Sequence, residues 1–364
     1  MKKSTIGFVT LIILITIILL VNFIPNNDKG NIKIGADFAL SGSVAVYGEW
    51  ASKGVNLALE EINKGSKKLE IIYEDNKGQP KDAVTAYNKL RNIDHVDYVL
   101  TFQSSVALAI APLANQDKVI QIDVSATTPD YSTPNDYTFR TGIVATQLAK
   151  ESSDILFNKL GIKEVGILSI NNDFGEGMKK VFKENYQGKI IAEEKFNQDA
   201  SDFKTQLNKL SGAKTIFLVS HLKESGLLVK QAAELKLDFN FFTDVFSVEG
   251  PDFIDIAKES AEEIVYVAPK FDIDDKNQEV SSFIEKYRTK YNEEPTYFAA
   301  QAYDAVLSLS KALENCSDTD CVREELMKLD FNGASGKIKF DVNGDVQKPI
   351  SLKTIKYGEF IKLE

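Results

Sequence analysis

One stretch of sequence decides how the rest of the chain is interpreted, namely Ile32-Lys-Ile-Gly-Ala-Asp-Phe-Ala-Leu-Ser-Gly-Ser-Val-Ala-Val-Tyr-Gly48. Its residues 32–38 are typical of a strand, and the Ser-Gly-Ser that follows at 41–43 is typical of a turn. A helical pattern of apolar residues begins at Val46. A strand that leads through such a turn into a helix predicts a ligand-binding loop at the carboxyl end of the strand.

Strand-like runs and helical patterns alternate as far as residue 268. Alternation of this kind predicts an α/β fold, in which mostly parallel sheets are flanked by helices and bind ligands beyond the carboxyl ends of their strands. The expected strands cover residues 32–38, 69–74, 96–101, 119–124, 164–170, 189–196, 215–220, 239–243 and 263–268. The expected helices cover residues 46–63, 80–91, 105–116, 145–160, 174–186, 201–210 and 223–235.

The pattern changes after residue 271, where three helices are expected at 278–291, 297–314 and 320–329, followed by a β-rich tail. In that tail, Asn343-Gly-Asp lies between the strand-like residues 337–342 and 350–355, which predicts a β-hairpin. The residues from Asp341 also resemble the start of a calcium loop. Val346 stands where that loop needs glycine, so we favour the hairpin.

Composition limits the class of function. The chain has 364 residues, a net charge of −10 and no basic stripe beyond its first residues, which excludes nucleic acid as a partner. Apolar residues make up 43% and charged residues 26% of the chain, as in ordinary globular proteins. About 335 residues follow the apolar N-terminus, more than one core usually serves, so we expect two lobes. A monomer is the default expectation.

The N-terminus combines two lysines with a long apolar run. Lys2 and Lys3 precede residues 6–24, which carry no charge. About 20 apolar residues span a bilayer as a helix, and lysines before them favour a cytoplasmic N-terminus. We therefore expect residues 1–30 to be a transmembrane anchor and a polar tether, with the remaining chain outside the cytoplasm on the cytoplasmic membrane. A cleaved secretory signal is the alternative, although no small-residue cleavage site follows the run.

Cys316 and Cys321 are the only cysteines. In an oxidising compartment such a close pair usually forms a disulfide, so we expect this bond. A zinc site is the weaker interpretation, because the only histidines, His95 and His221, are far away in sequence. We expect neither a metal nor a cofactor.

Several motifs, taken in their order and spacing, resemble those of one family. They are LSGSVAVYG from Leu40 leading into GVNLALEEIN from Gly54, YEDNKGQP from Tyr73, SSVALAIAPLA from Ser104, SATTP from Ser125, FRT from Phe139, NNDFGEG from Asn171 and GKIKFDVNGD from Gly336. Over residues 31 to 360 the chain resembles the type I periplasmic binding proteins of the leucine/isoleucine/valine-binding family, the receptor subunits of ABC importers.

This resemblance implies a two-lobed clamp whose chain crosses between the lobes three times, near residues 140–143, 269–272 and 337–341. Lobe 1 would comprise residues 31–141 and 272–337, and lobe 2 residues 142–271 and 338–364. The ligand would bind in the cleft between them, and the lobes would close around it by hinge motion.

Two loops of lobe 1 are candidates for binding a carboxylate. Ser104 and Ser105 lie between an expected strand and an apolar helix, where serines cap the helix and backbone N–H groups attract an anion. Ser125, Ala126 and Thr127 follow the next strand, so their polar groups can face the same point. An N-cap and an ordinary turn explain these residues equally well from sequence alone. The resemblance implies that both loops hold the ligand carboxylate.

Two aromatic residues match positions that line the cleft in the resembling family. Tyr47 lies among small residues of the first loop rather than within an apolar stripe. Phe174 stands where the family usually has tyrosine, so it can cover an apolar ligand but cannot donate a hydrogen bond. Trp50, one helical turn from Tyr47, fits a cleft wall and a core position equally.

The family positions that face a ligand ammonium group are less well matched. The tyrosine position falls at His221 or Leu222, and we place Leu222 in the predicted site. The acid falls at Val245 or at its neighbour Asp244, which is a plausible ammonium partner. If neither position supplies an acid to the cleft, amides, short peptides, urea-like compounds and aromatic acids remain open as ligands.

Three functions compete. The first is a solute-binding protein that hands an amino acid or a related carboxylate or amide to ABC permease subunits. The second is a ligand-sensing ectodomain that signals through a partner protein; because the chain stops at Glu364 without a further span, we favour the first. The third is an enzyme, which we do not expect, because no G-x-S-x-G elbow, phosphate loop or dinucleotide fingerprint is present.

Overall fold

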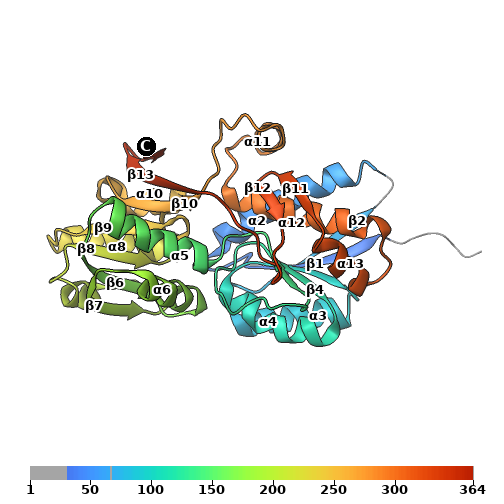
Figure 1. Cartoon of the computed structure of the whole chain (residues 1–364), viewed down its shortest axis with the longest axis horizontal. Coiled ribbons are helices and arrows are strands. Elements are labelled where there is room, and N and C mark those ends of the chain that lie inside the picture. The colour runs from blue at the N-terminus through green and yellow to red at the C-terminus, as the bar shows by residue number, and fades with distance from the viewer. Residues whose placement is uncertain (1–30, 66–67, 364) are drawn as a thin grey trace, which may run out of the picture.

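The computed structural model describes residues 31–65 and 68–363 and shows two halves, each built on its own β-sheet (Figure 1). The sheet of the first half has the order β2-β1-β3-β4-β5, and all of its strands pair in parallel. These strands are β1 (Ile32–Phe38), β2 (Leu69–Asp75), β3 (Tyr98–Thr101), β4 (Ile120–Asp123) and β5 (Thr138–Arg140).

The sheet of the second half has the order β14-β13-β10-β9-β8-β6-β7. Strands β6 to β10 pair in parallel, whereas β13 is antiparallel to β10 and to β14. The strands are β6 (Glu164–Ile170), β7 (Lys189–Phe196), β8 (Thr215–Val219), β9 (Asn240–Asp244), β10 (Val265–Pro269), β13 (Ile350–Lys356) and β14 (Glu359–Lys362).

Helices cover both faces of each sheet. In the first half α2 packs against α12 and α3 against α4, and in the second half α5 packs against α6 and α8 against α10. The helices are α2 (Ala45–Ile62), α3 (Pro80–Asn92), α4 (Ser104–Asp117), α5 (Ala145–Asp154), α6 (Asp173–Asn185), α7 (Lys204–Lys209), α8 (Leu222–Glu234), α9 (Val245–Val248), α10 (Pro251–Ala257), α11 (Gln278–Tyr291), α12 (Tyr297–Ala312) and α13 (Thr319–Leu326).

The pairing of α2 with α12 depends on a close backbone approach. A Cβ atom on Gly54 would lie 2.0 Å from the carbonyl oxygen of Ala299, so only glycine fits at this crossing. The tight crossing buries Val55 and Ala58 on α2 and Ala302 on α12. It also fixes the orientation of the first turns of α2, which carry the aromatic residues of the candidate site.

The predicted α/β architecture is confirmed, and the nine strands predicted before residue 271 form within two residues of their expected bounds. Three strands were not predicted, namely β5, β11 (Asp330–Gly333) and β14. They have three or four residues each, too few to show an apolar alternation. Within residues 31–65 and 68–363, no helix is both long enough and apolar enough to cross a bilayer. The predicted anchor at residues 1–30 lies outside the described residues.

The predicted hairpin between residues 337–342 and 350–355 is wrong. Strand β12 (Gly336–Lys339) instead pairs with β11, while β13 pairs with β10 and β14. The carboxylate of Asp304 explains why β12 pairs with β11. It accepts hydrogen bonds from the N–H groups of Ala334 and Ser335 and so fixes the turn between these two strands. The turn at Asn343-Gly344 forms, but it joins no pair of strands.

A disulfide bond joins Cys316 to Cys321 just before and within the first turn of α13. The N–H group of Cys321 also donates to the carboxylate of Asp318, which caps this helix. The bond and the cap together hold the short connection between α12 and α13 on the first half.

A buried arginine holds the segment that leads from the first half to β13. Arg140 is fully buried, and its Nε lies 2.5 Å from Oδ1 of Asp345. Its guanidinium also donates to the carbonyl oxygens of Ala126 and Thr128 and to the hydroxyl of Ser132. Residues 337–341 were predicted as the third crossing; because Asp345 still contacts the first half, we propose that the chain crosses after it. The predicted division into lobes otherwise stays a prediction.

We expect Asp345→Ala to lower the free energy of unfolding by about 3–5 kcal/mol, because it leaves the buried Arg140 charge without its partner. Asp238→Ala is the matched control, since Asp238 pairs with Lys214 on the exposed surface and its loss should change stability by less than about 1 kcal/mol. Urea unfolding monitored by circular dichroism measures both. Equal effects of the two substitutions would contradict this role for Arg140.

Candidate functional site

The two sheets direct the carboxyl ends of their parallel strands toward a shared cavity between the halves. This cavity has a volume of about 10 Å³, about enough for one water molecule, so a solute enters only if the surrounding side chains move apart. It is lined by Tyr47, Phe102, Gln103, Ser104 and Ser125 of the first half and by Phe174, His221 and Phe246 of the second.

Tyr47 connects the two halves directly. From α2 its hydroxyl donates to the carbonyl oxygen of Phe246 at 2.6 Å and accepts from the N–H group of Leu222 at 3.2 Å. The side chain is buried, and burial raises the pKa of its hydroxyl well above the usual value, so the hydroxyl stays neutral. The sequence predicted Tyr47 and Leu222 as site residues, and the structure brings them together through the backbone of Leu222.

An aromatic cluster surrounds Tyr47. Its ring lies 5.8 Å from Phe102 and 5.5 Å from Phe298, measured between ring centroids. Trp50, which the sequence left open between core and cleft, stacks on Phe298 in a nearly parallel arrangement. It also lies against Gly250, where an added Cβ atom would come within 2.9 Å of the indole. Trp50 is therefore a buried residue that packs at the interface between the halves, one layer behind the cavity.

The serines of the first half lie at the amino end of α4. The Ser104 hydroxyl accepts from the N–H groups of Thr127 and Thr128 at 3.1 and 3.3 Å, which joins the two predicted carboxylate-binding loops. The Ser105 hydroxyl accepts from the N–H group of Asp173 at 3.3 Å, across to α6 of the second half. Ser105 therefore contributes a contact between the halves and does not line the cavity itself.

The second predicted loop is shaped by a buried aspartate. Asp123 ends β4, and its Oδ1 accepts from the N–H groups of Ser125 and Ala126, which turns the chain toward the cavity. The Ser125 hydroxyl then donates to Gln301 on α12 at 3.0 Å. Thr127 is fully buried, and its hydroxyl oxygen has no hydrogen-bond partner among the described residues.

The wall of the second half is aromatic. Phe174 on α6 stacks on His221, with ring centroids 5.4 Å apart, and lies 5.2 Å from Phe246. Burial lowers the pKa of His221 to about 4, so the imidazole is neutral at physiological pH. This wall therefore presents π faces and neutral nitrogen atoms to the cavity, and no fixed charge.

Asp244 does not line the cavity, although the sequence suggested it as an ammonium partner. It is fully buried at the end of β9, where its Oδ1 accepts from the N–H group of Phe246 at 2.9 Å and caps the short helix α9. Burial raises the pKa of its carboxyl to about 7. The position that reaches the cavity is Phe246, two residues further along the chain.

Three residues that line the cavity, Phe102, Gln103 and Phe246, were not named from the sequence, and His221 was named only as the alternative to Leu222. Each follows the last residue of a parallel strand by one to two positions: Phe102 and Gln103 follow β3, His221 follows β8 and Phe246 follows β9. A search for the first side chains after each predicted strand would have found them. Gln103 also has a φ of 87°, which places it in a conformation that favours glycine and marks a constrained turn.

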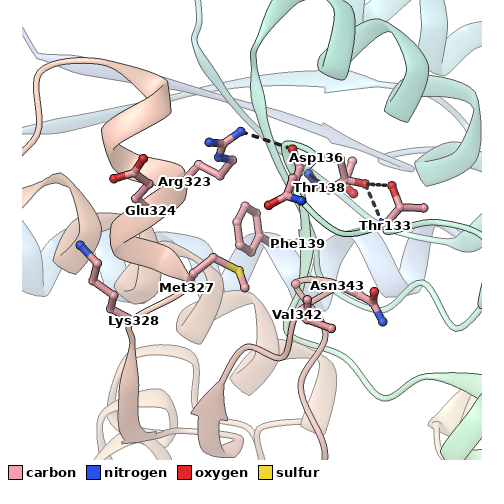
Figure 2. Close-up of a pocket in the computed structure, with 12 residues that line it drawn as sticks. Thr133, Asp136, Thr138, Phe139, Arg323, Glu324, Met327, Lys328, Val342 and Asn343 are labelled. Carbon is pink, nitrogen blue, oxygen red and sulfur yellow. Dashed lines mark hydrogen bonds between the residues drawn. The ribbon is translucent and has the colours of Figure 1, made fainter.

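A second, larger pocket of about 380 Å³ lies on the first half between α13 and the turn at Val342 (Figure 2). Its polar groups are largely engaged with one another. The carboxylate of Asp136 accepts from the N–H groups of Thr133 and Thr138, and Arg323 donates to the carbonyl oxygen of Asn135. The cavity between the halves, where both sheets converge, is therefore the candidate site.

Comparison with known proteins shows the family of this chain. The sequence model of the family described as "Periplasmic binding protein" matches residues 31–357. The chain belongs to this family. A relative from Pseudomonas aeruginosa, the leucine-, isoleucine-, valine-, threonine-, and alanine-binding protein, is 27% identical over 87% of each chain. The resemblance predicted from the motifs is confirmed.

Solved structures place this binding protein in the same fold as receptors with different ligands. It is 29% identical to the branched-chain amino acid transporter substrate-binding protein LivJ from Streptococcus pneumoniae in complex with isoleucine, with a TM-score of 0.84 over 92% of this chain and 99% of that one. A solute-binding protein from Rhodopseudomonas palustris in complex with 3,4-dihydroxybenzoic acid is 22% identical, with a TM-score of 0.81 over 92% and 96%. The fold alone therefore does not fix the ligand.

We expect Tyr47→Phe to open the two halves of this binding protein. The substitution leaves the Phe246 carbonyl and the Leu222 N–H group without their partner, a loss of about 1–3 kcal/mol for the closed arrangement. The distance distribution between spin labels on Ile93→Cys and Lys189→Cys, two exposed positions on opposite halves, should shift to longer values.

Tyr131→Phe is the control for this measurement. Tyr131 is also buried, but its hydroxyl bonds to the carbonyl oxygens of Gln121 and Phe139 within the first half. The label distances should be unchanged by this control. Unchanged distances in Tyr47→Phe as well would show that its hydroxyl does not hold the halves together.

Proposed function

We propose that this protein is the extracytoplasmic solute receptor of an ABC importer. It binds a small amino acid or a related carboxylate or amide in the cavity between its halves, and the halves close around the ligand. The observation that carries this proposal is the meeting of residues from both halves around one cavity, with the Tyr47 hydroxyl bound to the backbone of the second half. Family membership and the amino acid-binding relatives support it.

The chemistry of the cavity supports binding rather than catalysis. Nucleophilic catalysis by serine requires a base within hydrogen-bond reach of the hydroxyl. Among the described residues, no serine hydroxyl is hydrogen-bonded to the imidazole of His221, whose Nδ1 has no partner. The Ser104 hydroxyl accepts from two backbone N–H groups and the Ser125 hydroxyl donates to Gln301. These serines are held as parts of a binding surface.

The ligand test uses thermal unfolding of the full chain with amino acids, amides, short peptides and aromatic acids. A ligand present at about 100 times its Kd stabilises the folded state by about 2.7 kcal/mol, which raises the melting temperature measurably. We expect at least one class to do so, and Ser104→Ala to weaken that ligand by about tenfold, because its hydroxyl positions two loops.

Ser211→Ala, an exposed serine of the second half, is the matched control and should leave the affinity unchanged. If no compound of any class raises the melting temperature, the receptor function is wrong. If a ligand binds but its uptake by the partner permease does not depend on this chain, the sensing function replaces the importer function.

We further propose that residues 6–24 retain the receptor at the cytoplasmic membrane. The support is the length of this uncharged run, which suffices for one membrane crossing as a helix. The intact mass of the protein from the membrane fraction should equal that of a chain that still carries these residues. A mass that corresponds to a start after residue 24 would show that the segment is a cleaved signal.

A further inference from the structure

The cavity between the halves contains no acidic side chain among the eight residues that line it. Five of the eight carry rings, namely Tyr47, Phe102, Phe174, His221 and Phe246, and the other three are Gln103, Ser104 and Ser125. A ligand ammonium group is strongly hydrated, and its burial without a counter-charge is expensive. The lining therefore suits an apolar part of the ligand, and it supplies no acidic side chain that would compensate the charge of a buried cation.

The direction of the helices around the cavity also opposes a cation. Helix α4 begins at Ser104, α6 begins at Asp173 beside Phe174, and α8 begins at Leu222 beside His221. The amino end of a helix carries a partial positive charge and unpaired N–H groups. Three such ends converge on the cavity from both halves, and together they favour an anion or a neutral acceptor over an ammonium group.

The contact made by Tyr47 shows which chemistry the second half satisfies. The Leu222 N–H group and the Phe246 carbonyl oxygen offer one donor and one acceptor to the same hydroxyl. A hydroxyl or an amide can accept from the N–H group and donate to the carbonyl oxygen. An ammonium group has only donors and would leave the Leu222 N–H group unpaired. A ligand that displaced the Tyr47 hydroxyl would therefore have to bring a neutral polar group to this point.

Three acids lie near enough to Tyr47 to act on its hydroxyl, namely Glu224, Asp244 and the exposed Asp252, and none of them lines the cavity. Asp244 and Glu224 are fully buried, and each has one oxygen engaged by a backbone N–H group, that of Phe246 and that of Asp199. Burial raises the pKa of both carboxyls, that of Asp244 to about 7. Their second oxygens have no partner among the described residues, but neither side chain lines the cavity. Asp173 is exposed at the rim.

We propose that the ligand of this cavity is a carboxylate or amide on an aromatic or branched apolar body that carries no free ammonium group. This inference rests on the proposed receptor function and narrows it. The carboxylate or amide is held at the first half, where Ser104, at the amino end of α4, and Ser125 line the cavity. Thr127, whose hydroxyl is buried and unpartnered among the described residues, donates its N–H group to Ser104 from behind them. The rings of Tyr47, Phe174 and Phe246 enclose the apolar body.

The experiment compares matched pairs of compounds that differ only in the amino group, by calorimetric titration of the full chain. The first pairs are L-leucine with 4-methylpentanoate and L-phenylalanine with 3-phenylpropanoate. If the tightest compound of the wider screen is another one, it is compared with its own counterpart that has gained or lost the amino group. We expect the compound without the amino group to bind at least about tenfold tighter.

An amino acid that binds as tightly as its counterpart, or more tightly, overturns the inference and leaves the receptor function standing. Binding of no compound in the screen overturns the receptor function itself, so the two failures are distinguishable. A second arm uses 3-methylbutylamine, which keeps the apolar body and replaces the carboxylate with an ammonium group. It should not compete with 4-methylpentanoate, and competition between the two would also overturn the inference.

Discussion

The direction of parallel strands is the constraint on which the rest of this structure depends. Because β1, β3 and β4 all run the same way, their carboxyl ends lie at one edge of the sheet, and the helices that follow them begin there. The second half repeats this arrangement with β6, β8 and β9. Two such edges facing each other bring helix amino ends and the first residues after the strands to one cavity.

The same constraint explains how much the sequence could predict. The strands and long helices follow from local apolar patterns, and the candidate loops follow from their places after strands, so the sequence named Tyr47, Ser104, Ser125 and Phe174, which line the cavity. These predictions need only local information and the rule that ligands bind at the carboxyl edge. They do not depend on which strands pair across large distances in the sequence.

The hairpin prediction failed because it depended on such a long-range choice. The turn at Asn343-Gly344 was correctly placed, but the partner of each flanking strand was decided elsewhere, by Asp304 at one end and by the free edge of β10 at the other. Asp244 illustrates a different limit, the local register of the chain at the site. A shift of two residues decides whether an acid or Phe246 faces the cavity, and only the cap that Asp244 forms on α9 settles this.

Tyr47 places a physical condition on any ligand. Its hydroxyl already satisfies a buried donor and a buried acceptor of the second half, so a ligand that moves the hydroxyl aside must supply equivalent hydrogen bonds or leave both groups unpaired. A ligand that leaves the hydroxyl in place allows the two halves to close with both groups still paired, but it must fit among the surrounding rings. A ligand that displaces the hydroxyl is therefore selected through its polar match to Leu222 and Phe246, whereas a ligand that leaves it in place is selected through the fit of its apolar body among the rings.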